Sequence, residues 1–526
     1  MGRVLTNTTS FRYGKETSLG TGWSGGRHFE INSVSNFGAN ISTVTRNPID
    51  ANRQRLKGSI TTLESSFNVE HDLTMDTFED FIGNFLYSRV HNDNLDFKIT
   101  AVGSSNELTV EPINSSTITD ETRNYFKGGT NVYRTLVKIS GLANNSLNKE
   151  YFVQSDMSGN VIEVLESRNP INSSSDLTSK SLIQFAGFGI RAPSVNDKVS
   201  DISINNGILS FTLNDDINPV LAGKVKIGQF VCFGSSVGQS TVSLESGFIH
   251  NGNKITGLGR LKSIDDKTYS FDKLDTSFKG ISGTLGLDAN LDIYFGKYVK
   301  NVPVDNADYL EESFVFEAEF PKLGNSNETM YQYSRGNYCS QMTFNLPLAD
   351  KATMNLEFMG TDTDDPVETR ISGPADVSEN FRRQPFNTTS DIAKIRIQDI
   401  DNEGLSTYFK SLTLTLNNNV SAENVLGKLG AQFLNLGNLE VGISAQMHFT
   451  HSKVIDNIRS NGTVSLDFAL KNNDGGIVVD IPAMVISGGN RDFPENETVL
   501  INVEGMSFAD PVLNSSMNVS TFAFLG

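Results

Sequence analysis

Residues Arg46–Tyr87 read RNPIDANRQRLKGSITTLESSFNVEHDLTMDTFEDFIGNFLY, and they predict three consecutive elements. The first part, residues 46–57, is basic and contains an Asn-Pro pair, and a proline pushes the preceding residue toward extended geometry. Residues 59–73 predict a strand, because alternate side chains from Phe67 to Leu73 fall on one face. A charged loop therefore leads into a strand with one covered face.

A helix is predicted directly after this strand. Asp76 is a candidate N-cap with Glu79 three residues later, which is an aspartate variant of the capping box. Large apolar residues follow at helical spacing, and they are Phe78, Phe81, Ile82, Phe85 and Leu86. This stripe predicts a helix that lies on a sheet.

A fainter copy of the strand and helix occurs at residues 436–460, LGNLEVGISAQMHFTHSKVIDNIRS. Here a strand is expected at 437–449 and a short helix around 453–458, with Ser452 as its cap. Internal repeats of this kind point to the architecture of the whole chain. A unit used twice, with no catalytic motif between the copies, suggests a building block.

The composition predicts a β-rich protein with a negative surface. Among 526 residues there are 34 Phe, one Trp and 45 Gly, and 37% of the residues are hydrophobic. Such a chain is typical of many short strands joined by turns. The formal net charge of −18 repels polyanions, so DNA near this protein is expected to pass by without tight binding.

No targeting segment or disulfide framework is expected. The N-terminal residues 1–16 have no apolar run typical of a signal peptide, and no segment reaches the ~20 apolar residues of a membrane span. Cys232 and Cys339 have no metal-site spacing and are expected to be buried thiols. Asn-x-Ser/Thr triplets are attributed to the Asn-rich composition.

The rest of the chain predicts strands in several groups. Residues 1–45 suggest an extended arm with short strand pieces. Residues 133–165 and 226–274 share one pattern of strands and turns, which predicts two related all-β modules. Strands are also expected at 312–320, within 338–358, and at 411–416, 463–470, 475–486, 497–506 and 517–524, with a hairpin turn at Asn473-Asp474-Gly475. The polar stretch 361–391 is typical of a solvated linker.

Possible metal and catalytic motifs are weak. His448 and His451 lack a third ligand at metal-site spacing, and Asp362, Asp364 and Asp365 lack the glycine and glutamate of an EF-hand loop. GxGxxG at residues 20–25 and GxSxG at 22–26 and 234–238 lack the required strand and helix context. We therefore expect no catalytic, metal or cofactor site and no enzymatic activity.

Residues 46–57 contain four basic side chains, namely Arg46, Arg53, Arg55 and Lys57. Their role has two interpretations. They could contact nucleic acid, but no aromatic residues are interleaved with them and the chain is acidic. A loop that forms salt bridges between subunits is the preferred interpretation.

Four segments, in order, resemble the tail tube proteins of long-tailed (siphovirus-type) bacteriophages. The first is the Arg-rich loop, strand and helix at 46–86. The second, 313–362, includes the Y-x-x-G turn at Tyr333–Gly336. The third, LTLTLNNNVSAENVLGKLGAQFLNLGNLEVGISAQMHF at 412–449, contains the pattern NN, GxLG and a further Gly, and the fourth comprises the hairpins at 474–493 and 499–511. About 200 interior residues depart from the family pattern.

The resemblance implies a mainly β fold with two tandem tube domains, each a β-sandwich or barrel with a flanking helix. The expected organisation is a first tube domain in two parts (1–95 and 299–365), inserted β modules at 96–190 and 191–298, a linker at 366–392 and a second tube domain at 393–526. Three or six chains would form each ring, and stacked rings would make a conduit for double-stranded DNA at ejection. Expected partners are the chain itself and other tail proteins (tape measure, tail terminator and baseplate or distal tail), and no membrane. The location would be the virion tail, after assembly in the host cytoplasm.

Two other interpretations remain open at this point. A secreted or surface-layer adhesion protein fits the β-rich composition, although no signal peptide is predicted. A carbohydrate-active enzyme fits β modules, although no acid/base pair stands out among the 61 acidic residues.

Overall fold

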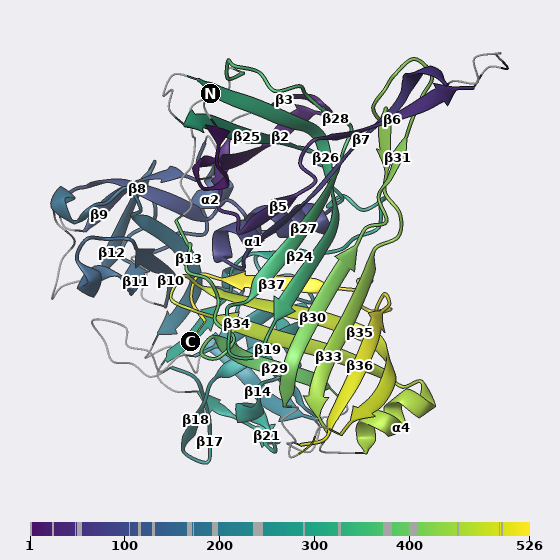
Figure 1. The fold of residues 1–526 in the computed structure, drawn as a ribbon. Coiled ribbons are helices and arrows are strands. Elements are labelled where there is room, and N and C mark those ends of the chain that lie inside the picture. Colours follow the sequence, from purple (N-terminus) through teal and green to yellow (C-terminus); the bar gives the residue numbers. More distant parts are fainter. Residues whose placement is uncertain are drawn as a thin grey trace.

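The computed structural model describes residues 3–23, 26–47, 49, 55–104, 106–113, 117–128, 132–165, 171, 173–191, 198–234, 246–287, 290–323, 328–371, 381–398, 408–449, 452–493, 495 and 498–525. The fold is mainly β, as the sequence predicts. One extended sheet and its folded-over layer occupy one side of the molecule, and a separate group of strands from the middle of the chain occupies the other side (Figure 1).

The extended sheet contains two sets of strands in which the pairing order is the same. The first set comprises β2 (Ser10–Ser18), β5 (Ser33–Ser35), β6 (Ala39–Arg46), β7 (Leu56–Asp72), β25 (Phe314–Leu323), β26 (Thr329–Leu346) and β27 (Thr353–Gly360). The second set comprises β29 (Ile392–Gln398), β30 (Phe409–Asn417), β33 (Glu440–His448), β34 (Thr463–Lys471), β35 (Gly476–Asp492) and β36 (Leu500–Ser507). The expected strands are therefore present, with ends shifted by a few residues.

The first set pairs in the order β2, β25, β26, β27, β7 and then β5 with β6. The second set pairs in the order β29, β34, β35, β36, β33 and β30. All these pairs are antiparallel. β7 and β33, the two strands that the sequence repeat identifies, thus occupy equivalent positions.

One further strand pair joins the two sets into a continuous sheet. β26 pairs with β30 from Gln341 opposite Asn417 to Leu346 opposite Leu412. The chain therefore contains one complete junction between its two halves.

Each half has a helix immediately after its equivalent strand. α1 (Met75–Phe85) follows β7, and α4 (Lys453–Ser460) follows β33. The prediction of an Asp76 cap was wrong, because Thr74 is the N-cap and makes no side-chain cap bond. Asp76 lies in the first turn and accepts hydrogen bonds from the backbone of a distant segment instead. Ser452 is the N-cap of α4, again without a side-chain cap bond.

The apolar stripe of α1 and the covered face of β7 form one aromatic core with β25 and β27. Phe358 is fully buried, and its ring centroid lies 4.6 Å from that of Phe316 and 5.4 Å from that of Phe67. His71 is also in this layer, and burial lowers its pKa to about 4. The period-two and period-3.6 patterns of the sequence correspond to these buried faces.

Residues 96–294 form two β modules with related topology. The first is a closed barrel, and the second repeats its strand order without closing among the described residues. The first contains β8 (Asp96–Val102), β9 (Glu107–Pro112), β10 (Tyr133–Ser140), β11 (Glu150–Val153), β12 (Val161–Leu165) and β13 (Leu182–Arg191), and closes through β10 with β13. The second contains β14 (Val199–Asn205), β15 (Ile208–Leu213), β16 (Phe230–Phe233), β19 (Gly257–Asp265), β20 (Thr268–Asp272) and β23 (Asn290–Tyr294). Five pairings of the first barrel recur at equivalent strands of the second, and β13 joins β23.

The inserted modules dock on the outer layer of the second half. Their Phe230 and Tyr294 pack with Val478 and Phe522 in a separate apolar cluster. Asp480 is buried in this contact and accepts hydrogen bonds from Arg260 (3.0 Å) and Lys273 (2.6 Å). Burial by itself raises the pKa of Asp480, but the two cations outweigh this effect and lower it.

Two polar segments pack more closely than their sequences suggest. Residues 1–45 contain the expected short strand pieces, but β2 also pairs with β25, and both Tyr13 and Phe29 belong to the core. The polar segment 366–392 is not simply solvated where it is described, because Arg382 is 7% exposed and Phe386 is fully buried. The turn at Asn473–Gly475 connects β34 to β35, as predicted.

The remaining named elements are short. They are β1 (Arg3–Val4), β3 (Thr21–Trp23), β4 (Arg27–Phe29), α2 (Asp120–Arg123), β17 (Phe248–His250), β18 (Asn253–Ile255), β21 (Gly283–Thr284), β22 (Gly286–Leu287), β24 (Tyr298–Lys300), β28 (Asp362–Thr363), β31 (Ser421–Glu423), β32 (Phe433–Asn435) and β37 (Asn518–Phe522), together with five 3-10 turns at 6–8, 145–147, 174–176, 218–220 and 276–278. In the part of the chain covered by the structure, no helix is long and apolar enough to cross a bilayer.

Candidate functional site

The continuous sheet has a face on which its central strands present polar side chains. Along each strand every second residue is buried in the core, and the residues between them are partly or fully exposed. We call a group of polar residues from this exposed set the polar sheet face. It comprises Asn68, Glu70, Asp72, Gln341, Thr343, Asn345, Thr353, Asn355, Glu357, Thr413, Thr415, Asn417, Glu440, Ser444, Gln446, Asn502 and Glu504.

The rows of this face continue across the junction between the halves. Asn355 lies opposite Thr343, and Thr343 lies opposite Thr415 on β30. Gln446 donates a hydrogen bond to Asn502 over 3.1 Å in the second half. The face is therefore one surface that both halves build from short, hydrogen-bonding side chains.

The charge on the polar sheet face is negative. Its ionisable members are Glu70, Asp72, Glu357, Glu440 and Glu504, and none of these paired residues is Lys or Arg. Lys410 is partly exposed on β30, but it lies at the bulge next to Ser411, outside the paired rows. Lys351 lies outside the set, just before β27, where it pairs with Asp72 over 2.7 Å. Such a surface offers a polyanion weak repulsion and hydrogen-bonding side chains, but no cation within its rows.

Two strand edges at opposite ends of this sheet have no partner among the described residues. β5 and β6 each pair with β7 only. Near its C-terminal end, β35 pairs with β36 on one side, while its other side, from Ile486 to Asp492, pairs with none of the described strands. Open edges of this kind favour association with another strand, so they are candidate assembly surfaces.

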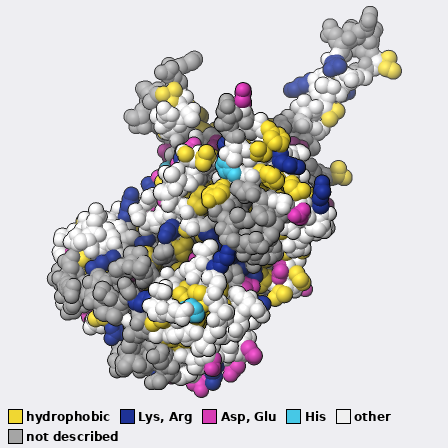
Figure 2. Space-filling view, turned by 90° about the horizontal axis from the view of Figure 1, so that it is seen from below, with side chains coloured by type: hydrophobic (Ala, Val, Ile, Leu, Met, Phe, Trp, Pro, Cys, Tyr) yellow, Lys and Arg dark blue, Asp and Glu magenta, His cyan; other side chains and the backbone are white. Residues whose placement is uncertain are grey.

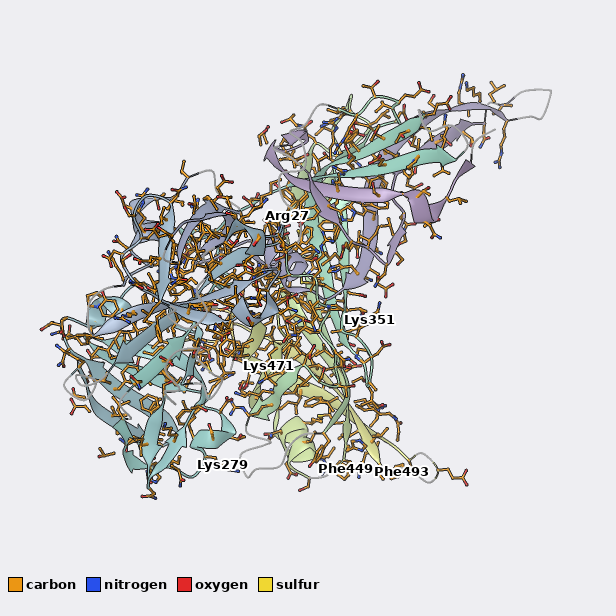
Figure 3. The ribbon with its side chains drawn as sticks, turned by 90° about the vertical axis from the view of Figure 1, so that its left-hand side faces the viewer. Arg27, Lys279, Lys351, Phe449, Lys471 and Phe493 are labelled. Carbon is orange, nitrogen blue, oxygen red and sulfur yellow. The ribbon has the colours of Figure 1, made fainter. Side chains whose placement is uncertain are left out.

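Apolar side chains are exposed near both open edges. Phe493 follows β35 and is 74% exposed, and it lies at the lower end of the molecule in Figure 3. The hairpin of β6 and β7 projects from the body as a narrow ridge, along which basic side chains are visible (Figure 2). Ile41 and Val44 on this hairpin are exposed. Unpartnered apolar surface near an open edge indicates contact with other protein.

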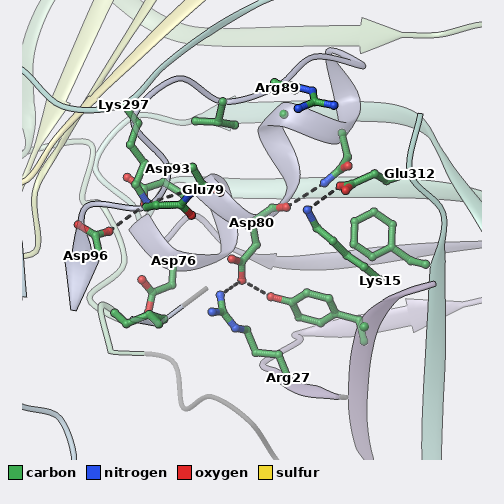
Figure 4. Close-up of a pocket in the computed structure, with 18 of the residues that line it drawn as sticks. Lys15, Arg27, Asp76, Glu79, Asp80, Arg89, Asp93, Asp96, Lys297 and Glu312 are labelled. Atoms are coloured by element: carbon green, nitrogen blue, oxygen red, sulfur yellow. Dashed lines mark hydrogen bonds and ion pairs between the residues drawn. The ribbon is translucent and has the colours of Figure 1, made fainter. Parts of the chain in front are cut away.

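The main cavity of interest lies between α1, the start of the insert and segment 381–382, and it has a volume of about 530 Å³ (Figure 4). Its floor is a buried charge cluster. Arg382 donates to Asp76 and to Glu79, each over 2.7 Å. Lys297 binds Glu79 over 2.7 Å and Asp96 over 3.0 Å. Asp80 accepts hydrogen bonds from Tyr13 and Arg27.

This charge cluster connects three parts of the chain rather than forming a catalytic centre. Arg382 comes from the segment between the halves, Glu79 from α1, and Asp96 with Lys297 from the two ends of the insert. Burial by itself raises the pKa of Glu79, but the charges of Arg382 and Lys297 outweigh it and lower the pKa to about 2. A carboxylate held ionised by two cations is a poor proton donor or acceptor near neutral pH.

The charge cluster predicts loss of stability in acid. Because the folded-state pKa of Glu79 is lowered, its contribution is fully present above about pH 4.5 and is lost as the pH falls toward 2. We expect the unfolding free energy to decrease by on the order of 3 kcal/mol from this group over that range. Urea unfolding at a series of pH values measures it. A Glu79→Gln variant should show a shallower pH dependence, and an unchanged dependence would contradict the assignment.

The remaining sequence candidates do not form sites in the described structure. His448 ends β33, whereas His451 lies outside the described residues. Asp362 belongs to β28 and Asp364 pairs with Arg335 over 2.7 Å. Within the described residues no group of three or more His, Cys, Asp or Glu side chains could hold a metal.

The structure also gives the positions of residues from the glycine-rich motifs, the cysteines and the basic loop. Gly20 lies in the turn between β2 and β3, Gly22 lies in β3, and Ser24 and residues 235–238 lie outside the described residues. Cys232 and Cys339 are buried free thiols, as expected. Arg46 and Lys57 are exposed at the hairpin, and Arg53 is among the residues that the structure does not describe.

Sequence reasoning missed two features, the structural role of Arg382 and the polar sheet face. The structural role of Arg382 was not visible, because its partners lie about 300 positions away and the segment looked like a linker. The polar sheet face could have been identified from the alternation in SLTLTLNN at 411–418, since every second residue there is Ser, Thr or Asn.

Comparison with known proteins identifies the family of the chain. No curated protein matches the chain. The family model described as "Phage tail tube protein" matches residues 6–507, which is nearly the whole chain and includes both halves of the sheet and the inserted modules. The repeated strand order and the negative polar face are thus found in a chain that belongs to the phage tail tube protein family.

Proposed function

We propose that this chain is the repeating subunit of a hollow tube in the tail of a long-tailed bacteriophage, and that double-stranded DNA passes through the tube at ejection. The observation that carries the proposal is the polar sheet face. Its opposite side is closed by the apolar core and α1, so the polar face is the surface that a tube would turn toward its lumen.

The chemistry of this face suits DNA transport. Duplex DNA carries about one negative charge per 1.7 Å, so a cation-rich lumen would bind it. Side chains such as Thr343, Thr415 and Asn502 offer no net charge, and the five carboxylates repel the phosphates weakly. The genome would slide through such a lumen without a preferred stopping point.

Each half of the sheet is proposed to be one tube domain. The first domain would comprise residues 1–95 and 299–365, the second residues 393–526, and 366–392 would connect them. Three chains would then give a ring with pseudo-sixfold symmetry. With four strands from each half, the ring would be a barrel of about 24 strands. Porin barrels of about 16–18 strands already leave an aqueous channel, so this wider barrel would leave one too.

The inserted modules, 96–190 and 191–298, are proposed to face outward. They pack on Val478 and Ala469, which lie on the outer layer of the second half, away from the polar sheet face. Rings would stack into a tube through contacts that do not close, as in other helical assemblies. The tape measure, tail terminator and distal tail or baseplate proteins are the further partners expected in the virion tail, after assembly in the bacterial cytoplasm.

Electron microscopy of the purified protein tests the proposal. We expect rings or tubes, and a reconstruction should show three chains per ring. Monomers at all concentrations would argue against the tube and favour an adhesion protein of the surface-layer type. Six chains in each ring would contradict the pairing of two tube domains in one chain.

The lumen assignment predicts a specific change in ejection. A phage whose subunit carries Glu70→Lys, Glu357→Lys and Glu504→Lys should assemble tails but eject DNA at least about tenfold more slowly, because the new cations bind phosphate. Ejection kinetics followed by dye release or light scattering measure the effect. Three lysine substitutions on the exposed surface of the insert, beginning with Asp265→Lys, change the charge equally and should leave ejection unchanged.

A further inference from the structure

The internal junction between β26 and β30 provides a template for a contact between two chains. Along this junction Asn345 lies opposite Thr413, and Leu346 lies opposite Leu412. Both leucines are buried, at 5% and 2% exposure. Because the two halves repeat the same strand order, each strand of the junction has an equivalent elsewhere in the chain.

The equivalent of β30 in the first half is β5 together with the start of β6. Thr413 pairs with Ser444 of β33, and Ser444 pairs with Glu504. In the first half, Ser35 pairs with Asn68 of β7, which pairs with Glu357. Ser35 therefore corresponds to Thr413, and Val34 corresponds to Leu412. The outer side of β30 is covered by β26, whereas the outer side of β5 is open.

The equivalent of the end of β26 in the second half is the end of β35. Asn345 pairs with Thr353, which pairs with Asp72. Asp492 pairs with Leu500, which pairs with His448 of β33. Asp492 therefore corresponds to Asn345, and Phe493 to Leu346. The side of β26 that contacts β30 corresponds to the open side of β35.

We propose that the end of β35 in one chain pairs antiparallel with β5 of a second copy, with Asp492 opposite Ser35 and Phe493 opposite Val34. The inference rests on the proposed function and adds to it the two strands that close the ring and their register. The contact is heterologous, since two different edges meet, and repeated heterologous contacts close a ring when the rotation allows.

Exposed apolar surface at the end of β35 supports pairing with a second copy of the chain. Phe493 is 74% exposed in the single chain, although its counterpart Leu346 is buried by the junction. Val34 already packs at the border of the main core. The aromatic side chain of Phe493 from the neighbouring chain, placed against Val34, would therefore extend that core. Pairing would also satisfy the free backbone groups of both edges, which are otherwise open to uncontrolled association.

Cysteine cross-linking tests the register. In a Ser35→Cys, Asp492→Cys double variant, the two thiols would lie on directly opposed residues, whose Cα separation of about 4.5–5.5 Å suits a disulfide. Mild oxidation of the assembled protein should give covalent oligomers on a non-reducing gel, with a series that ends at three chains. We expect at least about tenfold more cross-linked product than with either single variant.

Two further variants are matched controls. Asn345→Cys with Thr413→Cys places the same pair at the internal junction, and it should form a disulfide within one chain without covalent oligomers. Ser33→Cys with Asp492→Cys shifts the register by two residues and should cross-link poorly. The native Cys232 and Cys339 are buried and should not interfere.

The possible results separate the register from the function. Tubes that cross-link through Ser35→Cys and Asp492→Cys support both. Tubes without this cross-link, while the internal control does react, overturn the strand pairing but leave the conduit function standing. Monomers without any intermolecular cross-link overturn both. A Phe493→Ser variant gives a second reading, since it should weaken ring formation about tenfold or more through lost apolar contact, whereas Val304→Ser, which removes an equally exposed side chain, should not.

Discussion

An Arg382→Ala variant is expected to lose about 3–5 kcal/mol of unfolding free energy, because it removes one of the cations from a buried charge cluster and leaves its carboxylates only partly compensated. The guanidinium group is 8% exposed and contacts the carboxylates of Asp76 and Glu79. The Arg382 backbone N–H also donates to Asp76, and this bond would remain. Lys297 alone would then face the carboxylates of the cluster.

The effect should also reach the position of the inserted modules. Asp96 at the start of the insert lies 3.6 Å from Arg382 and shares Lys297 with Glu79. Loss of the arginine should therefore loosen the insert against α1, which limited proteolysis can detect as earlier cleavage near residue 96. Urea unfolding measures the stability change.

The adjacent residue provides a matched control. Arg383 pairs with Glu30 at the surface, where both side chains are more than a third exposed. Surface pairs of this kind contribute about 0–1 kcal/mol, so Arg383→Ala should change stability little. If the two arginine variants had equal stabilities, the structural role of the buried cluster would be disproved.

A Phe358→Ala variant is expected to lose about 3–5 kcal/mol, since a fully buried aromatic side chain is replaced by a cavity. Phe358 lies on β27 between β7 and β26, and its ring also faces those of Phe81 and Phe85 on α1. Its centroid is 4.6 Å from that of Phe316. The substitution removes a contact that holds the helix against the sheet.

The assembly should respond to this variant as well as the fold. The core face of β27 backs directly onto the polar sheet face, so a collapsed core would distort the curvature of the barrel wall. We expect a lower denaturation midpoint together with fewer tubes in electron micrographs. Phe358→Leu should recover most of the stability because it refills much of the volume.

An exposed phenylalanine provides a control that separates the effect of burial from the effect of losing a phenylalanine. Phe433 on β32 is 52% exposed, and Phe433→Ala should alter the unfolding free energy of the chain by about 0.5 kcal/mol or less. A loss at Phe433 as large as that at Phe358 would show that packing in the aromatic core is not the cause.

The sequence by itself determined the local elements and their buried faces. Alternation in β7 and in SLTLTL, and the stripe from Phe78 to Leu86, depend on which side of a strand or helix meets apolar surface. The same periodicity, repeated at residues 436–460, predicted the second unit. The net charge of −18 is also a property of residue types alone. These properties follow from residue types at short spacing, so one sequence is enough to show them.

Only the tertiary structure decided how the units combine. The junction of β26 with β30, the open sides of β5 and β35, and the capture of Asp76 by Arg382 join residues that are tens to hundreds of positions apart. Strand order and edge exposure depend on which distant backbone groups find hydrogen-bond partners, and no local period encodes that choice. For this reason the segment 366–392 looked like a solvated linker, although its arginine completes a buried cluster.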